Sequence, residues 1–262
     1  MSVRVGVFGA GGRMGTTVCR AVAGDPDMDL VAAIDPHHSG LDLRHVTGVD
    51  VDVHIYPDPT ALPEGGIDVV VDFTVLGAAR KNLAWAAENG VHAVVGTTGF
   101  TRDDHEQLRG MFTRSNCIIA PNFAIGAVLM MRFAELAAPW FETAEIIELH
   151  HDAKVDAPSG TALLTVARMA AASERWAADP TRTETLPGAR GAKGPGGIPV
   201  HSVRLRGLVA HQEVLLGTTG QSLTIRHDSY DRDSFMPGVL LAVKQVPDRP
   251  GLTVGLDALL GL

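Results

Sequence analysis

Short apolar runs alternate with amphipathic stretches through the first half of the chain. The runs at residues 3–8 and 30–34 are typical of buried strands, and between them Met14, Val18 and Val22 recur at helical spacing. The alternation continues with strand-like runs at 67–73, 91–95 and 117–120 and a helix-like stretch at 77–88. Strands that alternate with helices predict a doubly wound parallel sheet.

The pattern changes after Asn122. Two helices are expected, at residues 125–138 and from about Gly160, together with runs typical of a mixed or antiparallel sheet, at 145–149, 200–205, 213–216 and 222–225. A helix at 238–246 and a run at 252–256 return to the first domain. We therefore predict an α/β protein with a Rossmann-like dinucleotide-binding domain at 1–122, completed by 235–262, and an α+β domain for substrate binding and oligomerisation at 123–234.

The segment at residues 186–199 is rich in glycine and proline. Its five glycines and three prolines are typical of a long flexible loop. Arg190 and Lys193 lie within it, so a binding role and that of a plain connector both remain open.

Composition and charge narrow the possible partners. Among 262 residues, 22 are basic and 30 acidic, for a formal charge of -8, so the basic surface that nucleic-acid binding needs is not expected. We find no apolar run of the length that spans a membrane and no secretion signal, so a cytoplasmic location is expected. Cys19 and Cys117 lack metal-ligand spacing and are expected to be core thiols. An anionic ligand would need locally placed cations and N–H donors.

A glycine-rich turn follows the first strand and opens the first helix. Glycines 9, 12 and 15 have the GxxGxxG spacing, which lets a pyrophosphate approach backbone N–H groups and the positive end of the helix dipole. The residues expected at the pyrophosphate are Gly9, Ala10, Gly11, Gly12, Arg13 and Met14. Asp35 ends the second strand, where a carboxylate can bind the adenosine ribose hydroxyls. A plain tight turn and a helix-capping Asp35 are the alternatives.

The residues after Asp35 bear on cofactor choice. A carboxylate repels a 2′-phosphate, so we predict NADH as the preferred cofactor, with NADPH also accepted. Pro36, His37 and His38 stand where an arginine would favour NADPH. The histidines could meet a phosphate when protonated, or they could lie solvated in a loop.

Two further strand ends carry small polar residues. The third strand ends in Asp72-Phe73-Thr74, and the next is followed by Gly96, Thr97 and Thr98. Doubly wound folds bind ligands at the carboxyl ends of their strands, so these hydroxyls and backbone groups are expected at the nicotinamide carboxamide. A β-turn of small residues is the alternative.

Residues 148–162 concentrate groups suited to acid–base chemistry and anion binding. His150 and His151 lie at a strand end, where alternation lets only one enter a site unless the strand stops there. Lys154 adds a cation, and residues 158–161 resemble a helix start, whose hydroxyls and unpaired N–H groups can bind a carboxylate. His150, His151 and Asp152 are also metal-ligand types, but consecutive ligands suit a tetrahedral ion poorly, so no metal is expected. A capped helix beside surface histidines is the structural alternative.

Taken together, these segments resemble the dihydrodipicolinate reductases, especially their actinobacterial members. The resemblance rests on residues 9–15, 72–74, 96–100, 120–123 and 150–161, with weaker support from 207–213 and 225–227. It implies reduction of the dehydrated form of 4-hydroxy-tetrahydrodipicolinate, a small anionic dicarboxylate, to tetrahydrodipicolinate in lysine and diaminopimelate biosynthesis. It also implies a homotetramer built through the second-domain sheets.

The resemblance implies a role for each residue of the two sites. His150 would be the general acid that protonates the enamine left by hydride addition, and Lys154 would pair with a substrate carboxylate and assist protonation. His151 would contact the substrate, and the other carboxylate would be held by Ser159, Gly160 and Thr161. The wall beside the cofactor would be formed by Ala120, Pro121, Asn122 and Phe123. Val75 and Pro36 stand where some relatives carry basic residues, which weakens an NADPH-specific interpretation.

Two other functions would use the same glycine-rich turn. A semialdehyde-type dehydrogenase needs a nucleophilic cysteine, whereas Cys117 lies inside an apolar strand. A non-catalytic NAD(H)-sensing two-domain protein would leave residues 148–162 unexplained, and cofactor binding without turnover would favour it.

Overall fold

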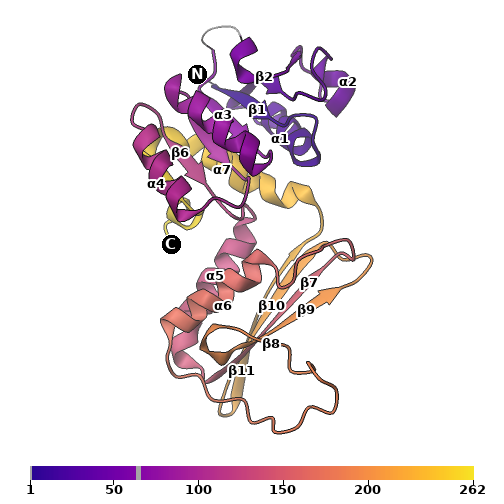
Figure 1. Cartoon of the computed structure of the whole chain (residues 1–262), viewed down its shortest axis with the longest axis vertical. Helices are drawn as coiled ribbons and strands as arrows, with labels where there is room; N and C mark the ends of the chain where they lie inside the picture. Colours follow the sequence, from indigo (N-terminus) through magenta and orange to yellow (C-terminus); the bar gives the residue numbers. More distant parts are fainter. Residues whose placement is uncertain (1, 63–65) are drawn as a thin grey trace. The chain divides into compact units, whose positions relative to one another are not determined.

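The computed structural model describes residues 2–62 and 66–262, which form two compact units (Figure 1). The first unit comprises Met1–Phe123 and Phe235–Leu262, and the second comprises Ala124–Ser234. The first unit thus extends one residue beyond the predicted boundary at Asn122. Phe123 belongs to it because its buried ring packs against Phe73, with 5.8 Å between the ring centroids.

The described strands of the first unit form one parallel sheet with the order β12-β6-β5-β4-β1-β2-β3. Their bounds are β1 (Val3–Phe8), β2 (Met28–Ile34), β3 (Ile55–Tyr56), β4 (Val69–Asp72), β5 (His92–Val95), β6 (Cys117–Ile119) and β12 (Leu252–Val254). The chain winds outward from β1 to β3 and then in the other direction from β4, so the winding reverses between β1 and β4. The Rossmann-like sheet is confirmed, and this reversal is where such sheets bind ligands.

Helices pack on this sheet as the apolar spacing predicts. Their bounds are α1 (Arg13–Gly24), α2 (Leu43–Thr47), α3 (Leu76–Glu88), α4 (Arg102–Met111) and α7 (Met236–Gln245). Val18 and Val22 of α1 are fully buried, at the predicted spacing. The sequence analysis did not predict α2, α4 or the two-residue β3. Helix α4 shows no apolar periodicity because it buries only Asp104 and Leu108. A capping box between Thr101 and Asp104 marks its start instead.

The second unit packs helices against a mixed sheet with the strand order β11-β10-β7-β9-β8. The bounds are α5 (Ile125–Ala137), β7 (Thr143–His150), α6 (Gly160–Ala172), β8 (Ala192–Lys193), β9 (Pro199–Arg204), β10 (Ala210–Thr218) and β11 (Gln221–Ser229). Strand β7 is antiparallel to β10 and parallel to β9, which confirms the predicted mixed sheet. The segment at 186–199 contains the short β8 and a 3-10 turn, Pro195–Gly197, so it is not irregular throughout.

Strand β7 separates its side chains onto the two faces of this sheet. Ala144, Ile146 and Glu148 are buried on one face, whereas Ile147 and Leu149 on the other face are only partly buried. Helices α5 and α6 lie along one face of the sheet in Figure 1, and α6 contacts β7. Glu148 is therefore a charged side chain at the end of an otherwise apolar row.

Candidate active site

The glycine-rich turn after β1 places backbone N–H groups at the start of α1. Gly9 has a φ of +72°, and a Cβ on Gly15 would lie 1.9 Å from the Gly9 carbonyl oxygen, so both positions need glycine. Gly12 caps α1 without a side-chain hydrogen bond. The first-turn N–H groups of α1 are not bound by a side-chain cap, and a Cβ-free loop lies beside them. This arrangement fits a pyrophosphate.

Asp35 follows β2 directly and lies beside the glycine-rich turn. Its buried carboxylate accepts hydrogen bonds from the N–H groups of Gly11 (3.0 Å) and His37 (2.9 Å), and His38 Nδ1 lies 3.2 Å from it. A Cβ on Gly11 would come within 2.2 Å of that same Nδ1. His38 thus covers the carboxylate and the turn, rather than lying solvated in a loop.

Asp72 ties together the strand ends that were predicted to face the nicotinamide. The carboxylate is fully buried and accepts hydrogen bonds from the Thr97 hydroxyl (2.9 Å), the Thr74 hydroxyl (2.7 Å) and the Asn82 amide (2.7 Å). The Thr97 hydroxyl is therefore committed to Asp72. Thr98 is exposed, so backbone groups and Thr98 remain for a ligand at this edge.

Close packing fixes the backbone around these strand ends. A Cβ on Gly96 would fall 2.0 Å from the Phe73 ring, and one on Gly238 of α7 would fall 2.1 Å from the Phe123 carbonyl oxygen. The N–H group of Ala120 donates to the Val95 carbonyl. In the first unit, the structure therefore brings the glycine-rich turn, Asp35, residues 96–98 and residues 120–123 to the carboxyl edge of one sheet.

The second unit holds the other group of predicted residues around the end of β7. His150 and Glu148 project from the same face of the strand, and His150 Nδ1 lies 2.5 Å from Glu148 Oε2. Arg204 of β9 donates from Nη1 to Oε2 (2.9 Å) and from Nη2 to Oε1 (2.8 Å) of the same carboxylate. The strand ends at His150, and His151 lies exposed just beyond it. Only His150 is thus held against the buried side of the strand end.

Burial and neighbouring charges set the protonation of this pair. Burial, with the positive charges of Lys154 and Arg204, lowers the pKa of His150 below its ordinary 6.5, against the opposing effect of Glu148. Burial alone would raise the pKa of Glu148, but hydrogen bonds from Arg204, Ser202 and His150 outweigh it, so the pKa is lowered. Glu148 is therefore a carboxylate at neutral pH, and His150 is mainly neutral.

Lys154 and the start of α6 complete this corner of the second unit. Lys154 Nζ binds both carboxylate oxygens of Asp156, at 2.7 and 2.9 Å, and its hydrogen bond lowers the pKa of Asp156. Ser159 caps α6 by accepting a hydrogen bond from the Ala162 N–H group. A Cβ on Gly160 would meet no atom within 4 Å, so a ligand could approach the backbone there. The corner thus combines an imidazole, a cation and a helix start.

Sequence reasoning missed the two residues that organise this corner. Glu148 begins the segment at 148–162, but the sequence alone predicts no role for it, and it predicts none for Arg204. The signal for Glu148 was available, because a glutamate that alternates with Ile146 and Ala144 on a strand must bury its charge. Arg204 could not be found without knowing that β9 pairs with β7, which places it beside His150.

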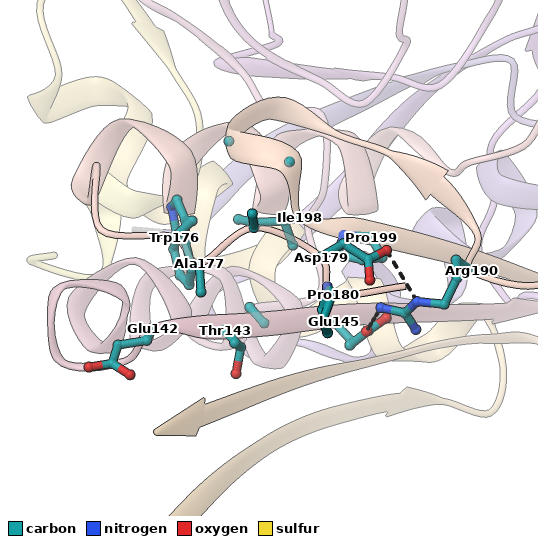
Figure 2. A pocket seen from close by; sticks show the side chains of 14 residues that line it. Glu142, Thr143, Glu145, Trp176, Ala177, Asp179, Pro180, Arg190, Ile198 and Pro199 are labelled. Carbon is teal, nitrogen blue, oxygen red and sulfur yellow. Dashed lines mark hydrogen bonds and ion pairs between the residues drawn. The ribbon is translucent and has the colours of Figure 1, made fainter. Parts of the chain in front are cut away.

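A separate pocket lies at the opposite end of β7 (Figure 2). It is lined by Glu142, Thr143 and Glu145 of the strand region, and by residues around Trp176, Asp179 and Arg190. Arg190 lies 2.5 Å from a Glu145 oxygen and 3.3 Å from an Asp179 oxygen. The sequence-predicted site residues are not among those that line this pocket.

Other chemistry finds little support in the described chain. Burial raises the pKa of the Cys117 thiol, which disfavours the thiolate that a semialdehyde-type dehydrogenase would use. Across residues 2–62 and 66–262, no three His, Cys, Asp or Glu side chains form a group that could hold a metal ion. Over the same residues, no helix is both long and apolar enough to cross a membrane.

The fold and the first-unit site define a class, the two-domain oxidoreductases that use a nicotinamide nucleotide. Among solved structures of similar fold is a Lactobacillus casei myo-inositol dehydrogenase in complex with NAD(H) and myo-inositol. It matches with a TM-score of 0.62 over 98% of this chain and 90% of that one, but at 13% identity it shows likeness of fold alone.

Closer comparisons identify the family. The family models described as dihydrodipicolinate reductase, N-terminus and C-terminus, match residues 3–123 and 126–260. The chain is 52% identical to the 4-hydroxy-tetrahydrodipicolinate reductase of Cutibacterium acnes, over 99% of both chains. It is 51% identical to that of Mycobacterium marinum, over 99% of this chain and 100% of that one. A solved dipicolinate-bound dihydrodipicolinate reductase from a Paenisporosarcina species matches with 42% identity and a TM-score of 0.87, over 98% and 99% of the chains. The chain therefore belongs to the dihydrodipicolinate reductase family, which confirms the resemblance.

Proposed function

We propose that the chain reduces the dehydrated form of 4-hydroxy-tetrahydrodipicolinate to tetrahydrodipicolinate with NAD(P)H, in lysine and diaminopimelate biosynthesis. The observation that carries the proposal is the corner at the end of β7, where His150, Lys154 and the start of α6 gather beside the buried Glu148. A small dianion needs cations and N–H donors in a protein whose overall charge is -8, and this corner offers both. Full-length identity of about half to reductases of this name supports the same reaction.

The first unit, Met1–Phe123 and Phe235–Leu262, is proposed to bind the cofactor, which supplies a hydride from its nicotinamide when bound. The pyrophosphate would lie against the N–H groups of the glycine-rich turn and of Arg13 and Met14 at the start of α1. Asp35 would accept hydrogen bonds from the adenosine ribose hydroxyls once His38 moves aside. The nicotinamide side would be held by backbone groups of residues 96–98 and bounded by residues 120–123.

The second unit, Ala124–Ser234, is proposed to bind the substrate and deliver the proton. His150 would give its proton to the enamine carbon after hydride addition, and His151 would contact the substrate. Lys154 would leave Asp156 for one substrate carboxylate and assist protonation, while Ser159, Gly160 and Thr161 would hold the other carboxylate at the start of α6. Negative charge brought by the substrate would raise the proton affinity of His150 at the moment when an acid is needed.

NADH is the proposed preferred cofactor, with NADPH also accepted. Asp35 repels a 2′-phosphate, and Pro36 stands where a basic residue would bind one. His37 and His38, which follow Pro36, could offset the repulsion between Asp35 and a 2′-phosphate. The ratio of KM values for the two cofactors tests the preference, and a KM for NADPH well below that for NADH would contradict it.

A homotetramer formed through the second-unit sheets is also proposed. The face of the sheet opposite Glu148 carries the partly exposed apolar side chains Ile147, Leu149, Val203 and Leu215. Strand β11 forms one edge of the sheet and is nine residues long, a length that invites pairing with another chain. We propose a cytoplasmic location because the reaction draws on the cell's NAD(P)H. Sedimentation equilibrium tests the assembly.

The reaction is tested by following the oxidation of NADH and of NADPH. The substrate is generated in place from pyruvate and aspartate semialdehyde by a matching synthase. Oxidation that depends on both the synthase and its substrates is the expected result. Folded protein that binds NADH but oxidises neither cofactor would overturn the proposal and favour a non-catalytic NAD(H) sensor.

A further inference from the structure

Glu148 occupies a central place in the second unit that the proposed reaction does not use. Its side chain is fully buried, yet each carboxylate oxygen accepts hydrogen bonds from more than one element. Oε2 accepts hydrogen bonds from His150 Nδ1 and Arg204 Nη1. Oε1 accepts hydrogen bonds from Arg204 Nη2 and, at 3.2 Å, from the Ser159 N–H group. One buried carboxylate thus joins β7, β9 and the residue that caps α6.

We infer that Glu148 is a positioning residue, which fixes the ring and the proton of His150 and ties the start of α6 to the same point. It would act through His150 and Ser159 and would not touch the substrate itself. This inference rests on the proposed role of His150 as the general acid. The acid and the carboxylate-binding helix start then share one anchor.

The contact with His150 determines which ring nitrogen carries the exchangeable proton. An ionised carboxylate only accepts hydrogen bonds, so Nδ1 must be the donor in this pair. Nε2 lies on the opposite side of the ring and is then the position that gains and loses a proton. Glu148 therefore turns Nε2 away from the strand and stabilises the imidazolium that an acid must form.

The other charges near His150 oppose its protonation. Arg204 from β9 and Lys154 from the loop after β7 both disfavour the imidazolium, and Asp156 is engaged by Lys154. Glu148 is thus the anion in direct contact with the ring. Without its charge, the imidazole would face Arg204 and Lys154 alone, and it would hold a proton only at lower pH.

The contacts with Ser159 and Arg204 extend the same anchor to the proposed carboxylate site. Glu148 accepts a hydrogen bond from the Ser159 N–H group, while the Ser159 hydroxyl oxygen caps α6 by accepting one from the Ala162 N–H group. Arg204 Nη2 also donates to the Asp156 carbonyl at 2.6 Å, on the loop that carries Lys154. A change at Glu148 should therefore disturb the acid most and the substrate-binding groups to a lesser degree.

Strand β7 supplies its own matched control at its other end. Glu145 also binds one histidine and one arginine, with 2.6 Å to His201 Nε2 and 2.5 Å to Arg190 Nη2. It lines the pocket in Figure 2, and its side chain is 30% exposed. Glu145→Gln therefore removes the same kind of pair from the same strand, away from the proposed site.

The test measures the pKa of His150 by NMR titration of its ring, together with kcat, KM and the pH dependence of kcat. Glu148→Gln should lower the pKa of His150 by about one unit or more and decrease kcat about tenfold or more, with a smaller change in substrate KM. The affinity for NADH should stay unchanged. Glu148→Asp should restore part of both quantities, because it keeps the charge. Glu145→Gln should alter neither.

A wild-type pKa of His150 and a wild-type pH profile in folded Glu148→Gln would overturn the inference. If that variant does not fold, Glu148→Asp decides, since the shortened side chain should still shift the pKa and lower kcat. Loss of thermal stability alone, without these shifts, would mean that Glu148 is merely structural. His150→Gln separates the two levels, because wild-type turnover in that variant would overturn the acid role itself. In proteins that keep His150, the effect of Glu148 on the pKa of the ring would remain measurable.

Discussion

Two fully buried carboxylates, Asp72 in the first unit and Glu148 in the second, anchor the two candidate sites in different ways. Asp72 accepts hydrogen bonds from neutral groups, the hydroxyls of Thr74 and Thr97 and the amide of Asn82. Glu148 instead meets Arg204 and His150, a cation and a group that can become one. The neutral donors around Asp72 hold the loops at the strand ends together, and these donors do not change charge near neutral pH. A charged partner couples the anchor to the protonation of a neighbour, which is what a catalytic acid requires.

The comparison predicts its largest effect at His150. His150→Gln keeps a hydrogen-bonding side chain but cannot deliver the proton, so kcat should fall about 100-fold or more. The affinity for NADH should hardly change. Stopped-flow and steady-state rates, with fluorescence titration of NADH, measure both. His105→Gln on α4, whose ring stacks on Phe100, is the matched control and should retain wild-type turnover. Near-normal kcat in His150→Gln would remove His150 from the proposed role.

Lys154 should show the next largest effect. Lys154→Ala removes a cation from the proposed site, so the substrate KM should rise about tenfold, as expected for one charge-assisted hydrogen bond, and kcat should also fall. Lys193→Ala, on the exposed β8, removes the same charge elsewhere in the second unit and should leave KM unchanged. Equal KM values for Lys154→Ala and the wild type would argue against a carboxylate contact.

Substitution of Asp72 should act on the stability of the first unit. Asp72→Asn keeps the shape but turns one acceptor into a donor that faces the Thr74 and Thr97 hydroxyls or Asn82. The expected cost is about 1–3 kcal/mol, or a fall in Tm of roughly 3–10 °C. Calorimetry measures the Tm, and the pH dependence of kcat should keep its wild-type form. A displaced pH profile would mean that Asp72, like Glu148, influences the catalytic acid, and the contrast between the two would fail.

His38 should have a smaller effect, confined to the cofactor. His38→Ala uncovers Asp35 and the turn at Gly11, so NADH should bind a few-fold more tightly, well below the tenfold that about 1.4 kcal/mol would give. Fluorescence titration with NADH and NADPH measures both dissociation constants. His45→Ala, on α2, is the control. Weaker binding of NADH in His38→Ala would show that the ring assists the cofactor instead of covering its site.

The two regions also differ in how much of them the sequence predicted. The longer strands, the glycine-rich turn and the segment at 148–162 follow from local spacing, because apolar periodicity and glycine chemistry are properties of neighbouring residues. Arg204 and the cover formed by His38 depend on strand pairing and loop packing, which local spacing does not encode. The hydrogen bond from the Thr97 hydroxyl to Asp72 likewise depends on the pairing of strands far apart in the sequence, whereas the predicted contact of Thr97 with the nicotinamide stays a prediction.

The weakest predicted effect is on the pH dependence of stability, and its sign follows from the directions of the two pKa shifts. The pKa of His150 in the folded protein lies below its ordinary 6.5, so the unfolded chain takes up a proton first as the pH falls. The stability that the neutral ring contributes is thus present above pH 6.5 and is lost on acidification. The pKa of Glu148 is also lowered, from 4.5, so its contribution is lost in a second, more acidic range.

Calorimetry of the wild type and His150→Gln across these two ranges separates the contributions. The variant should lack the first decline and keep the second, a difference in Tm of under about 3 °C between pH 6.5 and 4.5. Identical pH dependence in the wild type and His150→Gln would show that the folded environment does not disfavour protonation of His150. In that case the charge of Glu148 would fully offset the effects of burial, Arg204 and Lys154 on the pKa of His150. The imidazolium would then be as stable in the folded protein as in the unfolded chain.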